Sequence, residues 1–262
     1  MKKSILAIVI FFAVQMIALI SAMAYVAVQK GASFASIDLN APQNIEVLGF
    51  SLLFSNLTIA LLITLMNRNL VPNVRPALTA RNLFLTIISM VLMAFALSMM
   101  LEPINDMDGG TSAQFKAMEN SAVCIVAICF MGPIAEELTF RYGILANLRA
   151  SGVKPVLAVI VSATVFAIVH LNIFQGISAF IFGLLLGYIY IKTGSILFCI
   201  VGHIVNNSLA MISLHYPEME QSMTSASYAL TIPMSAALLL AAVICVSKLK
   251  NPYCIADENR ED

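Results

Sequence analysis

The sequence predicts an all-α integral membrane protein, a polytopic helical bundle of about eight transmembrane helices in a single domain over residues 1–262. Two observations predict this class. Hydrophobic residues make up 60% of the chain and charged residues only 11%, whereas soluble domains carry about 25% charged residues. Apolar runs also recur along the whole chain, and no interval between them could hold a soluble domain. The formal net charge is zero, so no nucleic-acid partner is expected.

Each expected span is an apolar run near the length of about 20 residues that crosses the hydrocarbon core. The runs cover residues 4–28, 47–66, 83–101, 121–148, 156–171, 173–191, 196–214 and 228–246. The fourth is long and contains charges, and the fifth is short and contains His170. The first resembles a secretory signal with a cleavage site at residues 22–24, but it continues to Val28, so an uncleaved helix is favoured.

Lysine and arginine residues between the runs predict the orientation, because cytoplasmic loops are enriched in them. With the amino terminus inside, eleven of these residues fall in cytoplasmic segments: Lys2, Lys3, Arg68, Arg75, Arg81, Arg149, Lys154, Lys192, Lys248, Lys250 and Arg260. Lys30 and Lys116 fall outside, and Arg141 lies within a run. An even number of helices also puts both termini on one side. The sequence therefore predicts a multi-pass protein of the cell membrane, in contact with membrane lipid, with both termini cytoplasmic.

Two glycine-containing motifs have structural interpretations. Gly132-Pro133 lies within the fourth run, where it predicts a kink or a break of the helix. Gly183 and Gly187 form a GxxxG motif in the sixth run, which predicts close packing against another helix.

Ionisable side chains occur inside three of the apolar runs, although each costs at least about 2.5–3.5 kcal/mol at the bilayer centre. They are Glu136, Glu137 and Arg141 in the fourth run, His170 in the fifth, and His203, near Asn207, in the seventh. At 1.5 Å per helical residue, the three runs place these groups about 16–22 Å from the inner surface. Similar depth on three helices predicts one shared site, in a cavity that opens to the cytoplasmic side beside Arg149, Lys154 and Lys192.

A structural role stays open for some of these groups. Glu137 and Arg141 are four residues apart, so they could form a buried ion pair that only fixes helix packing. Glu136 has no cation left to pair with, which favours a functional role. Asn206 is adjacent to Asn207 and points elsewhere on the helix, so it is expected to cap or pack.

Three motifs occur in order, each within an apolar run: EExxxR at 136–141, FxxxH at 166–170 and HxxxN at 203–207. Their order and spacing resemble the CPBP family of intramembrane endopeptidases. That family, which includes the ABI proteins, contains type II CAAX prenyl endopeptidases and bacteriocin-processing and immunity proteins. The resemblance covers residues 120–210, which would be the catalytic helices, and the first three spans carry no diagnostic residues.

The resemblance implies a membrane hydrolase that carries out intramembrane proteolysis on a peptide or a lipidated protein. Peptide hydrolysis needs an activated water and stabilisation of a tetrahedral oxyanion. The implied roles are water activation by Glu136 and His170, oxyanion stabilisation by His203 and Asn207, and orientation of the site by Glu137, Arg141 and Phe166.

A zinc-dependent metalloprotease stays open as an alternative. Glu136, His170 and His203 form a two-histidine, one-carboxylate set of the kind that catalytic zinc sites use. Amides are poor zinc ligands, and Asn207 has a clear role only without the metal. The cofactor is therefore none or zinc, and metal-independent catalysis is favoured.

Two other functional classes also stay open. A secondary transporter places charges at mid-membrane, but it often has two matching halves, and here the polar groups occur only in spans four to seven. A non-enzymatic immunity or scaffold protein would keep the fold and tolerate loss of Glu136.

Overall fold

The computed structural model describes residues 1–70, 78–107, 109–216, 218 and 228–250, and this part of the chain consists of helices joined by turns and short loops, without β-strands. The helices are α1 (Lys2–Lys30), α2 (Ile45–Met66), α3 (Ala80–Leu101), α4 (Thr111–Met118), α5 (Ala122–Val126), α6 (Gly132–Glu137), α7 (Ala146–Ala150), α8 (Pro155–Ile168), α9 (Ile173–Thr193), α10 (Ile196–His215) and α12 (Tyr228–Ser247). Two π-helical segments, η4 (Ala127–Met131) and η5 (Leu138–Leu145), join α5, α6 and α7. Short 3-10 turns cover Phe34–Ser36, Pro42–Asn44 and Glu102–Met107. Arg75 and Arg260, two of the charges counted above, lie outside the described residues.

Seven helical stretches of the described chain are long and apolar enough to cross a membrane. They are Lys2–Lys30, Pro42–Met66, Ala80–Ile104, Ala122–Ala150, Ile173–Thr193, Ile196–His215 and Tyr228–Ser247. The remaining apolar helix, α8, has 14 residues. At 1.5 Å per residue it is about 21 Å long, shorter than the hydrocarbon core of about 30 Å. The protein is therefore a multi-pass membrane protein, the prediction of about eight helices is confirmed, and the fifth is short as predicted.

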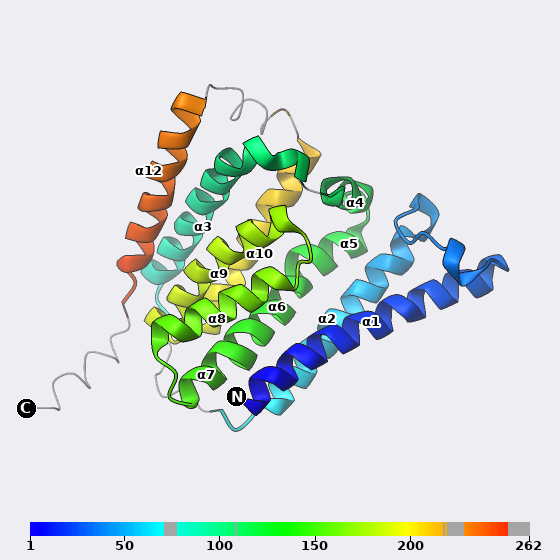
Figure 1. The fold of residues 1–262 in the computed structure, drawn as a ribbon, viewed down its shortest axis with the longest axis horizontal. Coiled ribbons are helices and arrows are strands. Elements are labelled where there is room, and N and C mark those ends of the chain that lie inside the picture. The colour runs from blue at the N-terminus through cyan, green and yellow to red at the C-terminus, as the bar shows by residue number, and fades with distance from the viewer. Residues whose placement is uncertain (71–77, 108, 217, 219–227, 251–262) are drawn as a thin grey trace, which may run out of the picture.

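Hydrogen bonds show which helix ends lie together. The Met1 amino group donates to Ser151 Oγ (3.1 Å), Lys3 Nζ to the Met66 carbonyl (3.0 Å), and Arg81 Nη1 to the Lys248 carbonyl (3.0 Å). We call this the amino-terminal end of the bundle. It holds Met1, the last residues of α2, α7, α9 and α12, and the first residues of α3, α8 and α10 (Figure 1). We call the opposite end, which holds α4, the α4 end.

The bundle has a central part between two outer helix pairs (Figure 1). The α1–α2 pair lies along one side, and α12 packs on α3 at the other. The central part contains α5 to α10, and α8 and α9 form a closely packed hairpin. Phe11 of α1 is buried against Phe140, with ring centroids 5.4 Å apart. The first span thus packs into the bundle core, although its retention after synthesis stays a prediction.

The fourth span is continuous, so of the predicted kink or break at Gly132-Pro133 the break does not occur. The chain instead passes from α5 to α7 through the two π-helical segments on either side of α6. In the η4 turn the Gly132 N–H donates to the Ala127 carbonyl, five residues earlier. Proline has no N–H, so Pro133 cannot donate in the same pattern to Ile128. π-helical turns of this kind are frequent at functional sites.

The GxxxG motif lies where α9 crosses α8, as predicted. A Cβ atom on Gly183 would lie 3.1 Å from the Cβ of Ala163, and one on Gly187 would lie 2.9 Å from Cγ1 of Val159. Both distances are shorter than ordinary carbon contacts of about 3.5–4.0 Å. The two glycines therefore allow two helices to pack closely: α8, which carries Phe166 of the FxxxH motif, and α9, which lines the site.

Candidate active site

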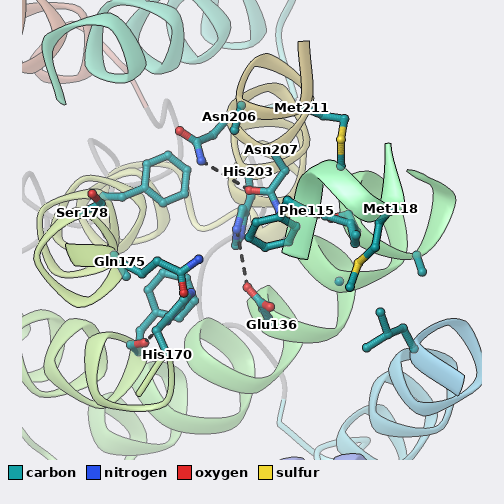
Figure 2. Close-up of a pocket in the computed structure, with 18 of the residues that line it drawn as sticks. Phe115, Met118, Glu136, His170, Gln175, Ser178, His203, Asn206, Asn207 and Met211 are labelled. Carbon is teal, nitrogen blue, oxygen red and sulfur yellow. Dashed lines mark hydrogen bonds and ion pairs between the residues drawn. The ribbon is translucent and has the colours of Figure 1, made fainter. Parts of the chain in front are cut away.

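The four side chains predicted to be catalytic line one cavity of about 490 Å³ (Figure 2). Glu136 comes from α6, His170 from the turn after α8, and His203 and Asn207 from α10. This volume is within the range of about 300–1,000 Å³ that is usual for ligand sites. Much of the remaining wall is apolar and includes Leu52, Leu97, Phe115, Met118, Phe174, Met211 and Leu214. The prediction of one shared cavity is confirmed.

Glu136 and Glu137 contact opposite edges of the same imidazole. Oε2 of Glu136 lies 3.5 Å from Nε2 of His203, and the Nδ1–H of His203 donates to Oε1 of Glu137 over 2.8 Å. The Glu136 side chain is 22% exposed and faces the cavity, whereas the Glu137 side chain is fully buried. The contact between Glu137 and His203 was not predicted, because the sequence assigned Glu137 to Arg141 alone.

The hydrogen bond to Glu137 determines what Nε2 of His203 can do. A neutral imidazole has one N–H, and here Nδ1 carries it. Nε2 would then oppose the carboxylate of Glu136 with a lone pair, and the contact is attractive only when a proton lies between the two atoms. The geometry therefore directs Nε2 of His203 at the Glu136 carboxylate, so that a proton on either atom would hold the two side chains together.

Arg141 is completely buried and paired, as the i, i+4 spacing predicted. Its Nε lies 3.1 Å from Oε2 of Glu137, and its Nη2 donates to the Gly183 carbonyl over 3.3 Å. The contact with Glu137 is close but is not aligned as a hydrogen bond, so its attraction is mainly ionic. The guanidinium carbon also lies 5.0 Å from the centre of the Phe166 ring, which adds a cation–π contact.

Phe166 is the buried side chain around which the two histidines are arranged. The centre of its ring lies 4.9 Å from that of His170 and 5.7 Å from that of His203, both edge to face. The Nδ1–H of His170 donates to the Phe166 carbonyl over 2.7 Å. In the neutral ring this leaves Nε2 of His170 as an acceptor, which could hold a water molecule in the cavity.

Asn207 links α10 to the irregular part of the fourth span. Its Nδ2 donates over 3.1 Å to the Ile128 carbonyl, which receives no hydrogen bond from Pro133 because proline has no N–H. Asn206 was expected to point elsewhere, and this is wrong. Asn206 lines the cavity, and its Nδ2 donates to Oδ1 of Asn207 over 3.3 Å (Figure 2).

Four further polar residues of the cavity wall were not predicted: Gln15, Asn56, Gln175 and Ser178. Asn56 is buried, and its Nδ2 donates to the Ala127 carbonyl over 3.4 Å. The signal that could have identified Gln15 and Asn56 is the one used for the histidines, a polar side chain within an apolar run. The prediction considered ionisable groups in the apolar runs, so it did not include the amide side chains of the first two spans.

The proposed zinc ligands do not form a three-ligand site as arranged. Among the described residues, no group of three or more His, Cys, Asp or Glu side chains is placed to hold a metal ion. Both ring nitrogens of His203 face carboxylates, and Nδ1 of His170 is bonded to a backbone carbonyl. The mechanism below therefore uses no metal step.

The cavity extends from Glu136 toward the α4 end. On α10 its lining runs from His203 to Leu214, away from the amino-terminal end, and α4 adds Phe115 and Met118. One turn below Glu136, Phe140 is 1% exposed and its ring lies 4.9 Å from that of Phe166. These buried rings close the cavity toward the amino-terminal end.

The prediction that the cavity opens beside Arg149, Lys154 and Lys192 is therefore wrong. All three residues lie at the amino-terminal end, and none of them lines the cavity. Loop charges report the orientation of a helix, but they do not report where the bundle is hollow.

Comparison with known families agrees with the motifs. Residues 118–209 match the family model described as type II CAAX prenyl endopeptidase Rce1-like. The match is consistent with the CPBP family and contains all seven predicted site residues. No curated protein and no solved structure matches the chain. The matched family implies a membrane protease that acts on a protein or peptide.

Proposed function

We propose that this protein is an intramembrane endopeptidase, in which Glu136 and His170 activate a water molecule and His203 and Asn207 stabilise the oxyanion. The observation that carries the proposal is the contact of 3.5 Å between Glu136 and His203, in a cavity that all four side chains line. The family match over residues 118–209 supports the same reaction class.

The first step is attack by water on the carbonyl carbon of the scissile peptide bond. The water is held between the Glu136 carboxylate and Nε2 of His170, whose Nδ1–H is bonded to Phe166. As the new C–O bond forms, Glu136 accepts the proton of the water, and the carbonyl electron pair moves to oxygen. A positioned base of this kind contributes about 10²–10⁴-fold to the rate.

The second step is collapse of the tetrahedral intermediate. The oxyanion accepts hydrogen bonds from Nε2–H of His203 and from the second N–H of the Asn207 amide, since the first N–H donates to Ile128. Each such donor contributes about 3–4 kcal/mol. The C=O bond re-forms, the C–N bond breaks, and the proton held by Glu136 passes to the leaving amine nitrogen. The products are a carboxylic acid and an amine, and transfer of the acid proton to the amine gives a carboxylate and an ammonium group.

Glu137 and Arg141 position His203 in this scheme. The Glu137 carboxylate accepts from Nδ1–H and so turns Nε2 toward Glu136, while Arg141 compensates the buried carboxylate. The apolar wall of the cavity suits a substrate with apolar side chains, as expected for a membrane-associated peptide.

The test compares peptides released by cells that lack the protein with those of cells that carry the wild-type protein, Glu136→Gln or Glu46→Gln. Glu136→Gln keeps the shape of the side chain and removes the proton acceptor, so we expect normal accumulation and at least a 100-fold loss of cleavage. Glu46 is exposed at the start of α2, away from the cavity, and its variant should cleave normally. Near-normal cleavage by Glu136→Gln would show that the general base is misassigned, and identical peptides with and without the protein would rule out an endopeptidase.

A further inference from the structure

The two ends of the bundle differ strongly in charge. Nine lysine and arginine residues of the described chain lie at the amino-terminal end: Lys2, Lys3, Arg68, Arg81, Arg149, Lys154, Lys192, Lys248 and Lys250. The α4 end has Lys30 and Lys116, together with Asp38, Glu46, Glu102 and Glu119. Because cytoplasmic segments are enriched in lysine and arginine, this distribution places the amino-terminal end in the cytoplasm and the α4 end outside.

The cavity faces the α4 end. From Glu136 and His203 its lining continues along α10 to Leu214 and across to α4, while Phe140 and Phe166 close it below. Substrate access from the cytoplasm would have to cross this buried aromatic layer and the Glu137–Arg141 pair. A substrate that enters from the α4 end reaches the open space of the cavity directly.

The rim of the cavity beside His170 is apolar and exposed. α8 is about 21 Å long, shorter than the hydrocarbon thickness of about 30 Å, whereas α9, which begins directly after the turn, is long enough to cross it, so the turn lies in the outer part of the membrane. Leu171 in this turn is 85% exposed and has a φ of 54°, and its neighbours Ile168 and Ile173 are also exposed. Exposed apolar side chains at this depth contact lipid, so the rim is accessible to a segment that is itself embedded in the membrane.

The helix α4 covers the cavity at the outer surface. Phe115 and Met118 line the cavity, whereas Lys116 is exposed and its Nζ donates to the Leu214 carbonyl over 2.9 Å. Asn172, in the turn before α9, donates to Thr111 Oγ1 over 3.1 Å. A short helix with apolar residues toward the cavity and a lysine toward solvent suits the interface between membrane and water.

We infer that the site takes its substrate from the non-cytoplasmic side, and that the substrate is an exported or outward-facing peptide anchored in the outer half of the membrane. This inference rests on the proposed function and names the substrate class of the same site. It separates such peptides from lipidated proteins that are held at the cytoplasmic surface.

The first experiment measures which side of the membrane reaches the cavity. Gln175→Cys in the cavity wall, Ser36→Cys at the α4 end and Ser151→Cys at the amino-terminal end are introduced singly into a cleavage-competent chain without its five native cysteines. A charged, membrane-impermeant methanethiosulfonate is added to intact or permeabilised cells. We expect Ser36→Cys and Gln175→Cys to react in intact cells and Ser151→Cys only after permeabilisation. The inference is overturned if Gln175→Cys reacts only together with Ser151→Cys, or from neither side.

The second experiment maps the cleavage sites. New peptide termini in membranes and medium are identified by mass spectrometry in cells with the wild-type protein and with Glu136→Gln. We expect termini that depend on Glu136 to lie outside, or in the outer half of membrane anchors. Dependent termini in cytoplasmic segments would overturn the access side and leave the endopeptidase standing. Absence of any dependent terminus would overturn the proposed function, and the substrate class with it, even if labelling places the cavity outside.

Discussion

Replacement of Arg141 by methionine leaves the Glu137 carboxylate buried without its cation. The Arg141 and Glu137 side chains are 1% and 0% exposed, and the pair is 3.1 Å apart. Removal of one member of such a pair typically costs about 3–5 kcal/mol, because the other charge stays buried and uncompensated. The variant also loses the hydrogen bond to Gly183 and the cation–π contact with Phe166, each about 0.5–2 kcal/mol. We therefore expect Arg141→Met to lower both stability and accumulation in the membrane.

The matched control is the double variant Glu137→Gln/Arg141→Met. Glutamine keeps an oxygen that can accept from Nδ1–H of His203, and it carries no charge that needs compensation. The double variant should therefore recover about 1–3 kcal/mol of the loss, as expected for two residues in direct contact. It should not recover all of it, because the contacts of Arg141 with Gly183 and Phe166 are still absent.

The assay is denaturant unfolding of the purified variants in one detergent, together with the amount of protein in the membrane. The reasoning is refuted if Arg141→Met unfolds at the wild-type midpoint and cleaves at the wild-type rate. It is also refuted if the double variant is no more stable than Arg141→Met, since the loss would then not come from an uncompensated charge.

Two other contacts give predictions that the same unfolding assay checks. Asn207→Leu leaves the Ile128 carbonyl without its side-chain donor and should cost about 1–3 kcal/mol of stability; cleavage should also fall at least about 100-fold, and a stability loss with normal cleavage would remove Asn207 from the oxyanion site. Gly187→Ala places a Cβ atom 2.9 Å from Val159 and should destabilise by about 1–3 kcal/mol. Gly176→Ala in the same helix meets an atom only at 3.4 Å and should be neutral or stabilising by about 0.5–1 kcal/mol; equal effects of the two alanines would contradict the packing account.

The spans and the residues of the site could be predicted from one sequence because a bilayer constrains both the apolar runs and the polar side chains within them. Apolar runs of sufficient length have few alternatives to a membrane helix. Glu136, His170 and His203 stood out because each is costly in such a run. The same logic predicted their common cavity, since three helices with a polar group at similar depth can satisfy those groups only together.

The contacts within the site could not be predicted from helical spacing. An ideal α-helix places Glu136 and Glu137 about 100° apart, which suggested separate partners. Both nevertheless contact His203, because its ring enters from α10 between the two carboxylates. The π-helical segments η4 and η5 also shift the register of the fourth span, so a regular helical projection does not give the faces of residues on either side of α6. These are tertiary effects that one helix does not encode alone.

The direction in which the cavity opens, in contrast, could have been predicted from the length of the fifth run. The helix of that run, α8, starts at Pro155 at the amino-terminal end of the bundle, and His170 follows its far end, with Asn172 capping the next helix by accepting from the Gln175 N–H. A span that stops short brings its last turn, and the histidine on it, into the membrane, where backbone groups need internal partners. Nδ1–H of His170 supplies one by donating to the Phe166 carbonyl. The open space must then lie beyond this turn, toward the α4 end, because the helix itself fills the space on the side of the amino-terminal end.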